Sequence, residues 1–352
     1  MLVGFSIFLS SVISLLFFRK LAFHVDLVDQ PNARKHHSGS VPLVGGLAVF
    51  LVLFAYLLFH PEVLGEPYTY LMCSLVLLFV GVVDDLRDIS YKIRLFVQLM
   101  VSIAMIQFGD VLLGNLGNII GLGNLVLPLF IAIPVTFVVV VGAINAFNMV
   151  DGIDGLLGSL TVITFSSLGI LFYLSEHQQN IGYTFSIVLA MLPFIFMNLG
   201  VPFGGRFKIF MGDAGSTVIG FTVVWLLVAG SQGDNPAFRP VTGLWVAAVP
   251  IIDAAVTIAR RIKKGQSPFQ ADREHLHHII MRLGFGPRQT LFVICLIASL
   301  FASVGILSEV YQLPESLMFA VFVAIACGYF YLMTRIWRIS VKVRKLLNLK
   351  KK

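Results

Sequence analysis

Long apolar segments separated by short polar loops constrain the fold of this chain more than any other feature. The eleven candidate segments are residues 1–18, 42–59, 68–83, 95–108, 127–147, 156–174, 182–200, 215–230, 241–258, 290–307 and 316–334. A helix needs roughly 20 apolar residues to cross the hydrocarbon core of a bilayer. With 58% hydrophobic and only 12% charged residues, the composition is that of a membrane protein. The sequence therefore predicts an all-α, polytopic transmembrane helical bundle of about eleven spans.

No long polar stretch separates these segments, so a second, soluble core is not expected. We predict a single transmembrane domain, residues 1–334, followed by a cytoplasmic tail, residues 335–352. The tail places basic residues between apolar ones at near-helical spacing, which is typical of an amphipathic helix that binds anionic membrane lipids. We expect the tail to anchor the chain and the domain to carry its catalytic chemistry.

The basic residues predict how the bundle is oriented. The first apolar segment is followed by Arg19 and Lys20 and has no cleavage site, which indicates a retained helix with its N-terminus outside. Eleven spans then place all but Arg239 of the 25 Lys and Arg residues on one side. The positive-inside rule makes that side cytoplasmic. We therefore expect a periplasmic N-terminus and a cytoplasmic C-terminus in the inner membrane of a bacterium. The net charge of +7 follows from this topology and does not indicate binding of nucleic acid.

Acidic residues gather on the same predicted side, at the ends of helices. The four clusters contain Asp84 with Asp85 and Asp88, Asp151 with Asp154, Asp213, and Asp26 with Asp29. One isolated Asp at a helix end needs no functional explanation, but ionised carboxylates near a bilayer are costly unless they are paired or bind a cation. Hard oxygen ligands select Mg²⁺ or Mn²⁺. The set predicts a metal-dependent site on the cytoplasmic face.

The largest cytoplasmic loop supplies groups of the opposite charge. It runs from Arg260 and Arg261 to His275, His277 and His278. A zinc site or neutral surface histidines are alternatives, but the surrounding Arg and Lys residues favour recognition of phosphate. Metal, cationic side chains and a carboxylate base are what phosphoryl transfer from a nucleotide to a lipid phosphate requires. We expect such an enzyme to lie in the membrane because its acceptor does.

Four ordered motifs resemble those of the polyprenyl-phosphate N-acetylhexosamine-1-phosphate transferase family. They are Asp84-Asp85, the stretch from Asn145 through Asn148, Asp151 and Asp154 to Leu156, the stretch from Phe210 through Asp213 to Ser216, and His275-Leu276-His277-His278. The resemblance spans nearly the whole chain and is strongest to the bacterial branch that transfers N-acetylglucosamine 1-phosphate to undecaprenyl phosphate. A related branch, the phospho-N-acetylmuramoyl-pentapeptide transferases, has three consecutive histidines, whereas Leu276 interrupts them here.

The resemblance implies an activity and its substrates. GlcNAc-1-phosphate would pass from UDP-GlcNAc to undecaprenyl phosphate, with release of UMP and with Mg²⁺ or Mn²⁺ as cofactor. The product would start lipid-linked O-antigen or enterobacterial common antigen synthesis, a part of lipopolysaccharide biosynthesis. A homodimer remains compatible with this interpretation. Another UDP-N-acetylhexosamine as donor, and either direct attack or a covalent Asp intermediate, remain open. We favour direct attack, because the lipid phosphate is itself a competent nucleophile.

The resemblance also implies roles for individual residues. Asp84, Asp85, Asp151 and Asp154 would be catalytic, and Asp84, Asp85 and Asp213 would bind the metal. The substrate-binding residues would be Asn148, Phe210 near the uracil, Asp29, and Arg261 with His275, His277 and His278 at the diphosphate and sugar. Two other classes fit less well. A secondary transporter would place its acids near the middle of helices, and a CDP-alcohol phosphotransferase would have Ala-Arg soon after Asp151-Gly152.

Overall fold

The computed structural model describes residues 2–30, 39–202, 204–267 and 275–335, and the predicted tail lies outside these ranges. The helices are α1 (Leu2–Ala22), α2 (Gly45–Phe59), α3 (Pro67–Arg87), α4 (Tyr91–Gly109), α5 (Leu129–Val150), α6 (Leu156–Leu174), α7 (Gln178–Asn198), α8 (Gly212–Ser231), α9 (Pro240–Val246), α10 (Ala248–Lys263), α11 (Leu276–Arg282), α12 (Pro287–Val310) and α13 (Glu315–Thr334). Two 3₁₀ turns, Pro61–Val63 and Gly204–Phe207, and two short strands, β1 (Val28–Asp29) and β2 (Val41–Pro42), complete the described elements. The prediction of a helical membrane protein is confirmed.

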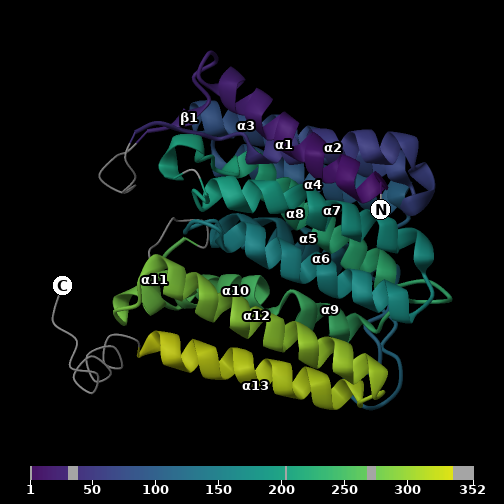
Figure 1. The fold of residues 1–352 in the computed structure, drawn as a ribbon. Coiled ribbons are helices and arrows are strands. Elements are labelled where there is room, and N and C mark those ends of the chain that lie inside the picture. The colour runs from purple at the N-terminus through teal and green to yellow at the C-terminus, as the bar shows by residue number, and fades with distance from the viewer. Residues whose placement is uncertain (1, 31–38, 203, 268–274, 336–352) are drawn as a thin grey trace.

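Helix α8 forms the centre of the bundle, and most of its residues are buried. It packs against α2, α3 and α5 (Figure 1). Its sequence is apolar around the whole circumference, which is typical of a helix surrounded by others. Glycines allow the close approach, because a Cβ on Gly46 or Gly81 would overlap the backbone of α8. Small residues serve this purpose in membranes, where apolar burial does not drive helices together.

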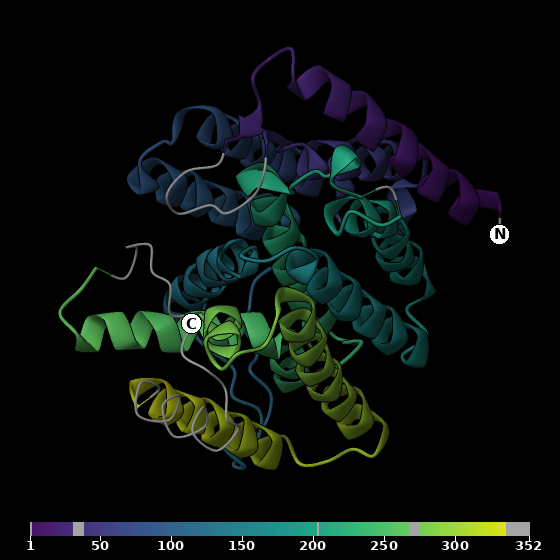
Figure 2. The same cartoon turned by 60° about the vertical axis from the view of Figure 1, so that its left-hand side comes forward.

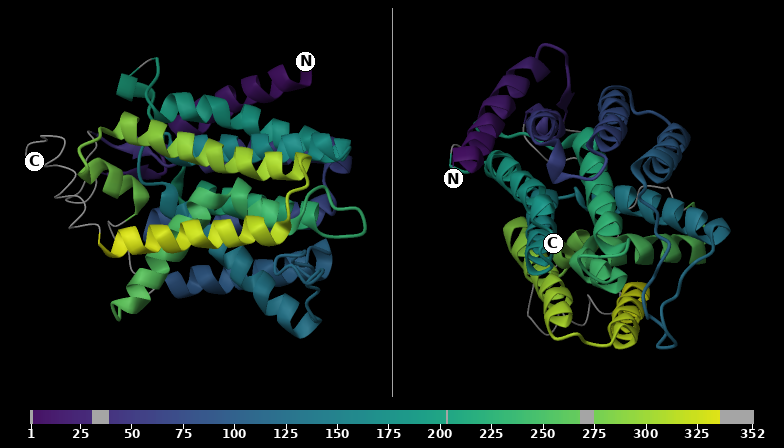
Figure 3. Two further views of the ribbon diagram at one scale, coloured as in Figure 1. Left: turned by 90° about the horizontal axis from the view of Figure 1, so that it is seen from below. Right: turned by 90° about the vertical axis from the view of Figure 1, so that its right-hand side faces the viewer.

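Most helix axes run in one common direction, as the two views in Figure 3 show. The start of α1 and the end of α13 lie at opposite ends of the bundle (Figure 1). Figure 2 brings forward the end where α13 finishes, which also carries α11 and the β1–β2 ribbon. The strands pair antiparallel, with Val28 opposite Pro42. This end is the one that the charge pattern assigns to the cytoplasm, and we call it the polar end.

The apolar segments of the sequence all coincide with helices, but one of them is broken. Nine helices in the described ranges are long and apolar enough to cross a membrane, and α2 is shorter, with 15 residues. The expected single span 241–258 is instead the pair α9 and α10, which meet at an angle of 85°. Pro250 explains the break, because it has no N–H to donate to the carbonyl of Val246. The predicted count of eleven spans and the sides of the two termini stay predictions.

A candidate active site at the polar end of the bundle

The end of α3 holds the beginning of α8. Both carboxylate oxygens of Asp85 accept hydrogen bonds from α8, one from the N–H of Asp213 at 2.8 Å and one from the N–H of Ala214 at 3.2 Å. The first N–H groups of a helix have no partner within the helix, so an acidic cap there is stabilising. Gly212 has a φ of 76°, and a Cβ there would lie 2.5 Å from Asp85 Oδ2. The Gly212-Asp213 pair therefore lets a carboxylate from another helix cap α8.

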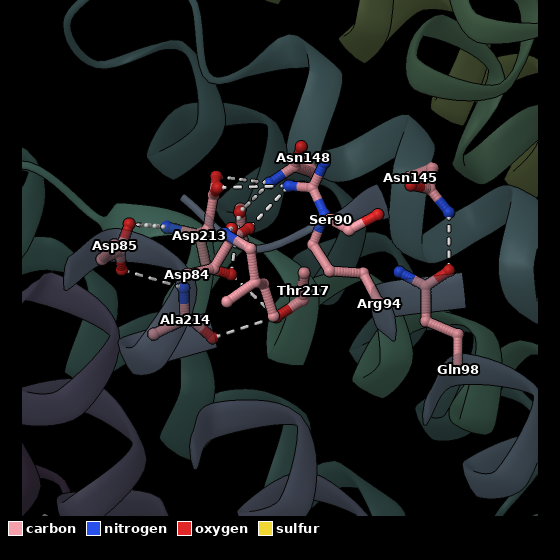
Figure 4. A network of polar contacts seen from close by, with 12 residues as sticks. Asp84, Asp85, Ser90, Arg94, Gln98, Asn145, Asn148, Asp213, Ala214 and Thr217 are labelled. Carbon is pink, nitrogen blue, oxygen red and sulfur yellow. Dashed lines mark hydrogen bonds and ion pairs between the residues drawn. The ribbon is translucent and has the colours of Figure 1, made fainter. Parts of the chain in front are cut away.

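Asp84 and Asp213 meet at one arginine, Arg94 from the first turn of α4 (Figure 4). The guanidinium donates to Asp84 Oδ2 at 2.6 Å and lies 3.5 Å from Asp213 Oδ2. The other oxygen of Asp84 accepts from the N–H of Ile89 at 2.9 Å. Asn148, at the end of α5, donates to Asp213 Oδ1 at 2.8 Å and to the hydroxyl of Ser216 at 2.9 Å. Four helices thus contribute to one polar network.

A second pair of polar side chains lies next to this network on α4 and α5. Asn145 donates to the side-chain oxygen of Gln98 at 2.8 Å and to the carbonyl of Val141 (Figure 4). Gln98 is buried. Because a buried amide is costly without partners, this hydrogen bond fixes the register of α4 against α5. It thereby fixes the position of Arg94 relative to Asn148, one turn nearer the polar end.

The turn between α5 and α6 carries Asp151 and Asp154 in different surroundings. Asp154 forms an ion pair with Lys208 at 2.6 Å, and the ammonium of Lys208 also lies over the ring of Phe210, 5.1 Å from its centroid. Burial of its carboxyl group among protein atoms, followed by the charges of Asp213 and Asp154, raises the pKa of Asp151 to about 7. Asp151 as a whole residue is exposed to solvent, however, so its carboxylate can exchange protons with a bound substrate.

The histidine segment, residues 275–278, is hydrogen-bonded to α10 on one side. On the other side it contacts the turn that carries Asp151 and Asp154, which we call the acidic turn. His275 is hydrogen-bonded to Asp253 of α10 at 2.9 Å, and its ring stacks on that of His277 with centroids 6.0 Å apart. The ring of His277 lies against Gly152, where a Cβ would overlap it. Burial, followed by the charges of His278 and His275, lowers the pKa of His277 to about 3. His277 is therefore neutral at physiological pH.

Three other predicted site residues lie around this region. Phe210 belongs to the segment beside β2, since its N–H donates to the carbonyl of Pro42 at 2.8 Å. Asp29 lies in β1, opposite Val41 of β2. Arg261 is buried in the last turn of α10, which precedes the histidine segment. The structure thus brings Asp84, Asp85, Asn148 and Asp213 into direct contact and places Asp29 at the edge.

Four residues of this region were not predicted as site residues. Arg94 and Lys208 lie among the basic residues of the predicted cytoplasmic loops, and Gln98 and Asp253 lie within apolar stretches. Asp253 could have been found, because a lone carboxylate in an apolar segment is expensive and is usually functional. Arg94 and Lys208 could not, since their carboxylate partners are set by helix packing.

The donor chemistry of the network fits Mg²⁺ or Mn²⁺, because it consists of hard carboxylate oxygens. Asp84 and Asp213 are the two residues whose oxygens already face one cationic group, Arg94, and they would hold the metal. Asp85 caps α8 through both oxygens, and Asp84 likewise accepts at both, from Ile89 and Arg94. Within the described ranges, no group of three or more His, Cys, Asp or Glu residues is arranged to hold a metal ion. The expected metal set of Asp84, Asp85 and Asp213 is therefore a proposal.

Comparison with known proteins shows which family this chain belongs to. The model of glycosyl transferase family 4 matches residues 68–231. Three relatives named undecaprenyl-phosphate α-N-acetylglucosaminyl 1-phosphate transferase cover nearly the whole chain. The Yersinia pestis protein is 45% identical over 96% of this chain and 93% of its own length. Those of Pasteurella multocida and Haemophilus influenzae are 43% and 42% identical, over 96% and 98% of this chain and 95% and 97% of theirs. The chain belongs to this transferase family.

The family model matches the carboxylate network of the site but not the segment that contains the histidines. The stretch that matches the family model contains Asp84, Arg94, Asn148 and Asp213 and ends with α8. The segment from Asp253 to His278 lies beyond it and is covered by the full-length transferase relatives alone. The chain is thus a glycosyl-1-phosphate transferase, as its resemblance to the family predicts.

Proposed function

We propose that this protein transfers GlcNAc-1-phosphate from UDP-GlcNAc to undecaprenyl phosphate and releases UMP. The names of relatives that are 42–45% identical over nearly the full length support the acceptor and the sugar. The observation in the structure that carries the proposal is the network of Asp84, Arg94, Asn148 and Asp213 at one end of an apolar bundle. A lipid acceptor enters such a site from the bilayer, and a nucleotide sugar enters it from water.

Different residues of the network would neutralise the charge of the two anionic reactants and hold the neutralising groups in position. Asp84 and Asp213 would hold Mg²⁺ or Mn²⁺, which when bound neutralises charge on the donor diphosphate. Arg94 lies between the same two carboxylates and supplies a second positive charge at that place. Asn148 fixes the orientation of Asp213, and Asp85 fixes the start of the helix that carries it. Preorganised charges of this kind contribute most of the rate acceleration in phosphoryl transfer.

Asp151 is suited to be the base. Its pKa of about 7 lies close to the operating pH, where a general base is most effective. The second ionisation of a phosphate monoester has a pKa of about 6, so a base with this pKa keeps the acceptor phosphate fully charged. Asp154 is less suited, because its carboxylate is paired with Lys208 at 2.6 Å.

Direct attack by the lipid phosphate fits these contacts better than a covalent Asp intermediate. Asp84 and Asp85 each already accept two hydrogen bonds or ion pairs, which lowers the nucleophilicity of their oxygens. The phosphate oxygen of the acceptor would attack the β-phosphorus of the diphosphate donor, counted from the uridine. The bond from that phosphorus to the bridging oxygen breaks, and UMP leaves with the electron pair.

The wider setting belongs to the same proposal. The protein would lie in the bacterial inner membrane with the polar end in the cytoplasm, where nucleotide sugars occur. The product would be the lipid carrier for O-antigen or enterobacterial common antigen synthesis. The predicted contact of residues 335–352 with anionic lipids and the homodimer stay predictions.

Release of UMP tests the proposal. Purified protein with undecaprenyl phosphate, UDP-GlcNAc and Mg²⁺ is expected to release UMP and to form a radiolabelled lipid when the sugar carries the label. Parallel reactions with UDP-GalNAc and with UDP-N-acetylmuramoyl-pentapeptide identify the donor. A faster reaction with either of these would replace the donor but keep the reaction class. Release of UMP without undecaprenyl phosphate at the same rate would contradict transfer to the lipid.

A further inference from the structure

A buried carboxylate on α10 connects three parts of the chain. Asp253 is only 3% exposed. Its Oδ1 accepts from the N–H of Leu276 at 3.0 Å and from the hydroxyl of Tyr329, on α13, at 2.7 Å. Its Oδ2 lies 2.9 Å from Nδ1 of His275. Within the described ranges, these hydrogen bonds lead to the start of α11 and to α13, and the one through Oδ2 leads to a predicted substrate-binding histidine.

The contact between Asp253 and His275 determines which nitrogen of the imidazole ring carries hydrogen. An ionised carboxylate only accepts hydrogen bonds, so Nδ1 of His275 must be the donor. Nδ1 is then occupied, and a substrate can contact His275 only through Nε2. A hydrogen bond to the second nitrogen is the usual way in which a protein selects the state of a histidine.

The orientation of the His275 ring affects the acidic turn through the ring of His277. The rings of His275 and His277 are nearly parallel, with 6° between their planes. His277 is 2% exposed, and its Nε2 has no hydrogen-bond partner in the described ranges. The same ring edge lies against Gly152, between Asp151 and Asp154. A rotation of His275 would therefore displace the ring that packs on this turn.

We propose that Asp253 is a positioning residue of the transferase site. It holds His275 with hydrogen on Nδ1 and with Nε2 turned toward the donor diphosphate, and it keeps the His275–His277 stack against the Gly152 turn. This inference rests on the proposed function, because it assigns Asp253 to the same site. It concerns a residue that acts through His275 and does not itself touch the substrate.

Asp253→Asn tests the proposal with little change of shape. Because Leu276 and Tyr329 both donate to Oδ1, the asparagine keeps its oxygen there and places its NH₂ group at Nδ1 of His275. Two donors cannot face each other, so the hydrogen moves to Nε2. We expect kcat/KM to fall by about 10- to 100-fold, as for other residues that orient a functional histidine. The double variant with His275→Gln should be no slower than His275→Gln alone, because Asp253 acts only through that ring.

Tyr329→Phe is the matched control, since it removes a hydrogen bond from Asp253 but leaves His275 bonded. We expect its kcat/KM to stay within a few-fold of the wild type, and both variants to unfold at temperatures close to that of the wild type. Multiplicative losses in the double variant, or an equal loss in Tyr329→Phe, would show that Asp253 acts as a general packing residue and would overturn the proposal.

The state of His275 can be read without any activity. In protein with ¹⁵N-labelled histidine, the His275 signals are identified by their loss in His275→Gln. Nδ1 should carry hydrogen in the wild type and lose it in Asp253→Asn. An unchanged Nδ1 signal would overturn the proposal even if activity fell. If the wild type released no UMP, the proposed function would fail, while this measurement would still decide what Asp253 does to His275.

Discussion

Individual charged residues at the polar end are distinguished by their partners and not by their type. Asp85 caps a helix, Asp84 is paired with Arg94, Asp154 is paired with Lys208, and Asp151 has its pKa raised to about 7. Ionised carboxylates this close to apolar surroundings need such partners. With its pKa raised to about 7, the carboxylate of Asp151 can take up a proton near neutral pH.

Asp151 should determine how activity depends on pH. Its pKa is raised from 3.8 to about 7, so the basic form is present above pH 7 and is lost as the pH falls through 7. We expect kcat/KM to decrease tenfold per pH unit below about pH 7, which forms the acidic limb of the pH profile. The Asp151→Asn variant should be slow, and its pH profile should lack this limb. Asp154→Asn serves as the control and should keep the limb. If the decrease below pH 7 persisted in Asp151→Asn, Asp151 would not be the group that controls it.

Asp213 should link activity to the metal. Asp213→Asn keeps an oxygen for the amide of Asn148 but removes a negative charge from the network. We expect a loss of about 100-fold or more in kcat/KM, because one charge-stabilising group is removed. The Mg²⁺ concentration for half-maximal rate should rise as well. Thr217→Ala, which changes only hydrogen bonds to backbone carbonyls of the same helix, should alter neither. An unchanged Mg²⁺ requirement in Asp213→Asn would exclude Asp213 as a ligand.

At the scale of helices, the beginning of α8 is held from two directions. Asp85 caps its free N–H groups from α3, and Gly46 of α2 lies against Gly215 without an intervening side chain. Asp213 takes part in the first contact and lies two residues before the second. The position of a functional carboxylate thus depends on backbone approach between helices that are far apart in the sequence.

Gly46→Ala should disturb this approach. Its Cβ would overlap backbone atoms of Gly215, which cannot rotate away as a side chain can. We expect a loss of about 1–3 kcal/mol in the free energy of unfolding, the usual cost of overpacking, together with lower activity. Gly142→Ala is the control, because a Cβ there meets nothing within 4 Å and a helix interior favours alanine. Thermal unfolding in detergent measures both, and equal midpoints would contradict the close contact.

For the whole molecule, the sequence predicted the class of fold and the gathering of the acidic clusters. Hydropathy located the helices because each apolar segment is long. The clusters that contain Asp84, Asp151 and Asp213 lie near one another because each follows or precedes a helix at the same end. It did not predict the break between α9 and α10, since a hydropathy average does not register that Pro250 lacks an N–H. Nor did it predict the pairing of Asp84 with Arg94, which depends on how α4 is rotated against α3 and α8.

The two parts of the broken helix, α9 and α10, are held by polar contacts with different helices. Just before α9, Arg239 forms an ion pair with Glu309 of α12 at 2.9 Å, and Asp253 of α10 accepts from Tyr329 of α13 at 2.7 Å. These partners follow 70 and 76 residues later in the chain. During synthesis, α9 and α10 are therefore made before the ion pair or the hydrogen bond can form. The two contacts that hold the parts of the bend can therefore form only after α12 and α13 have been made.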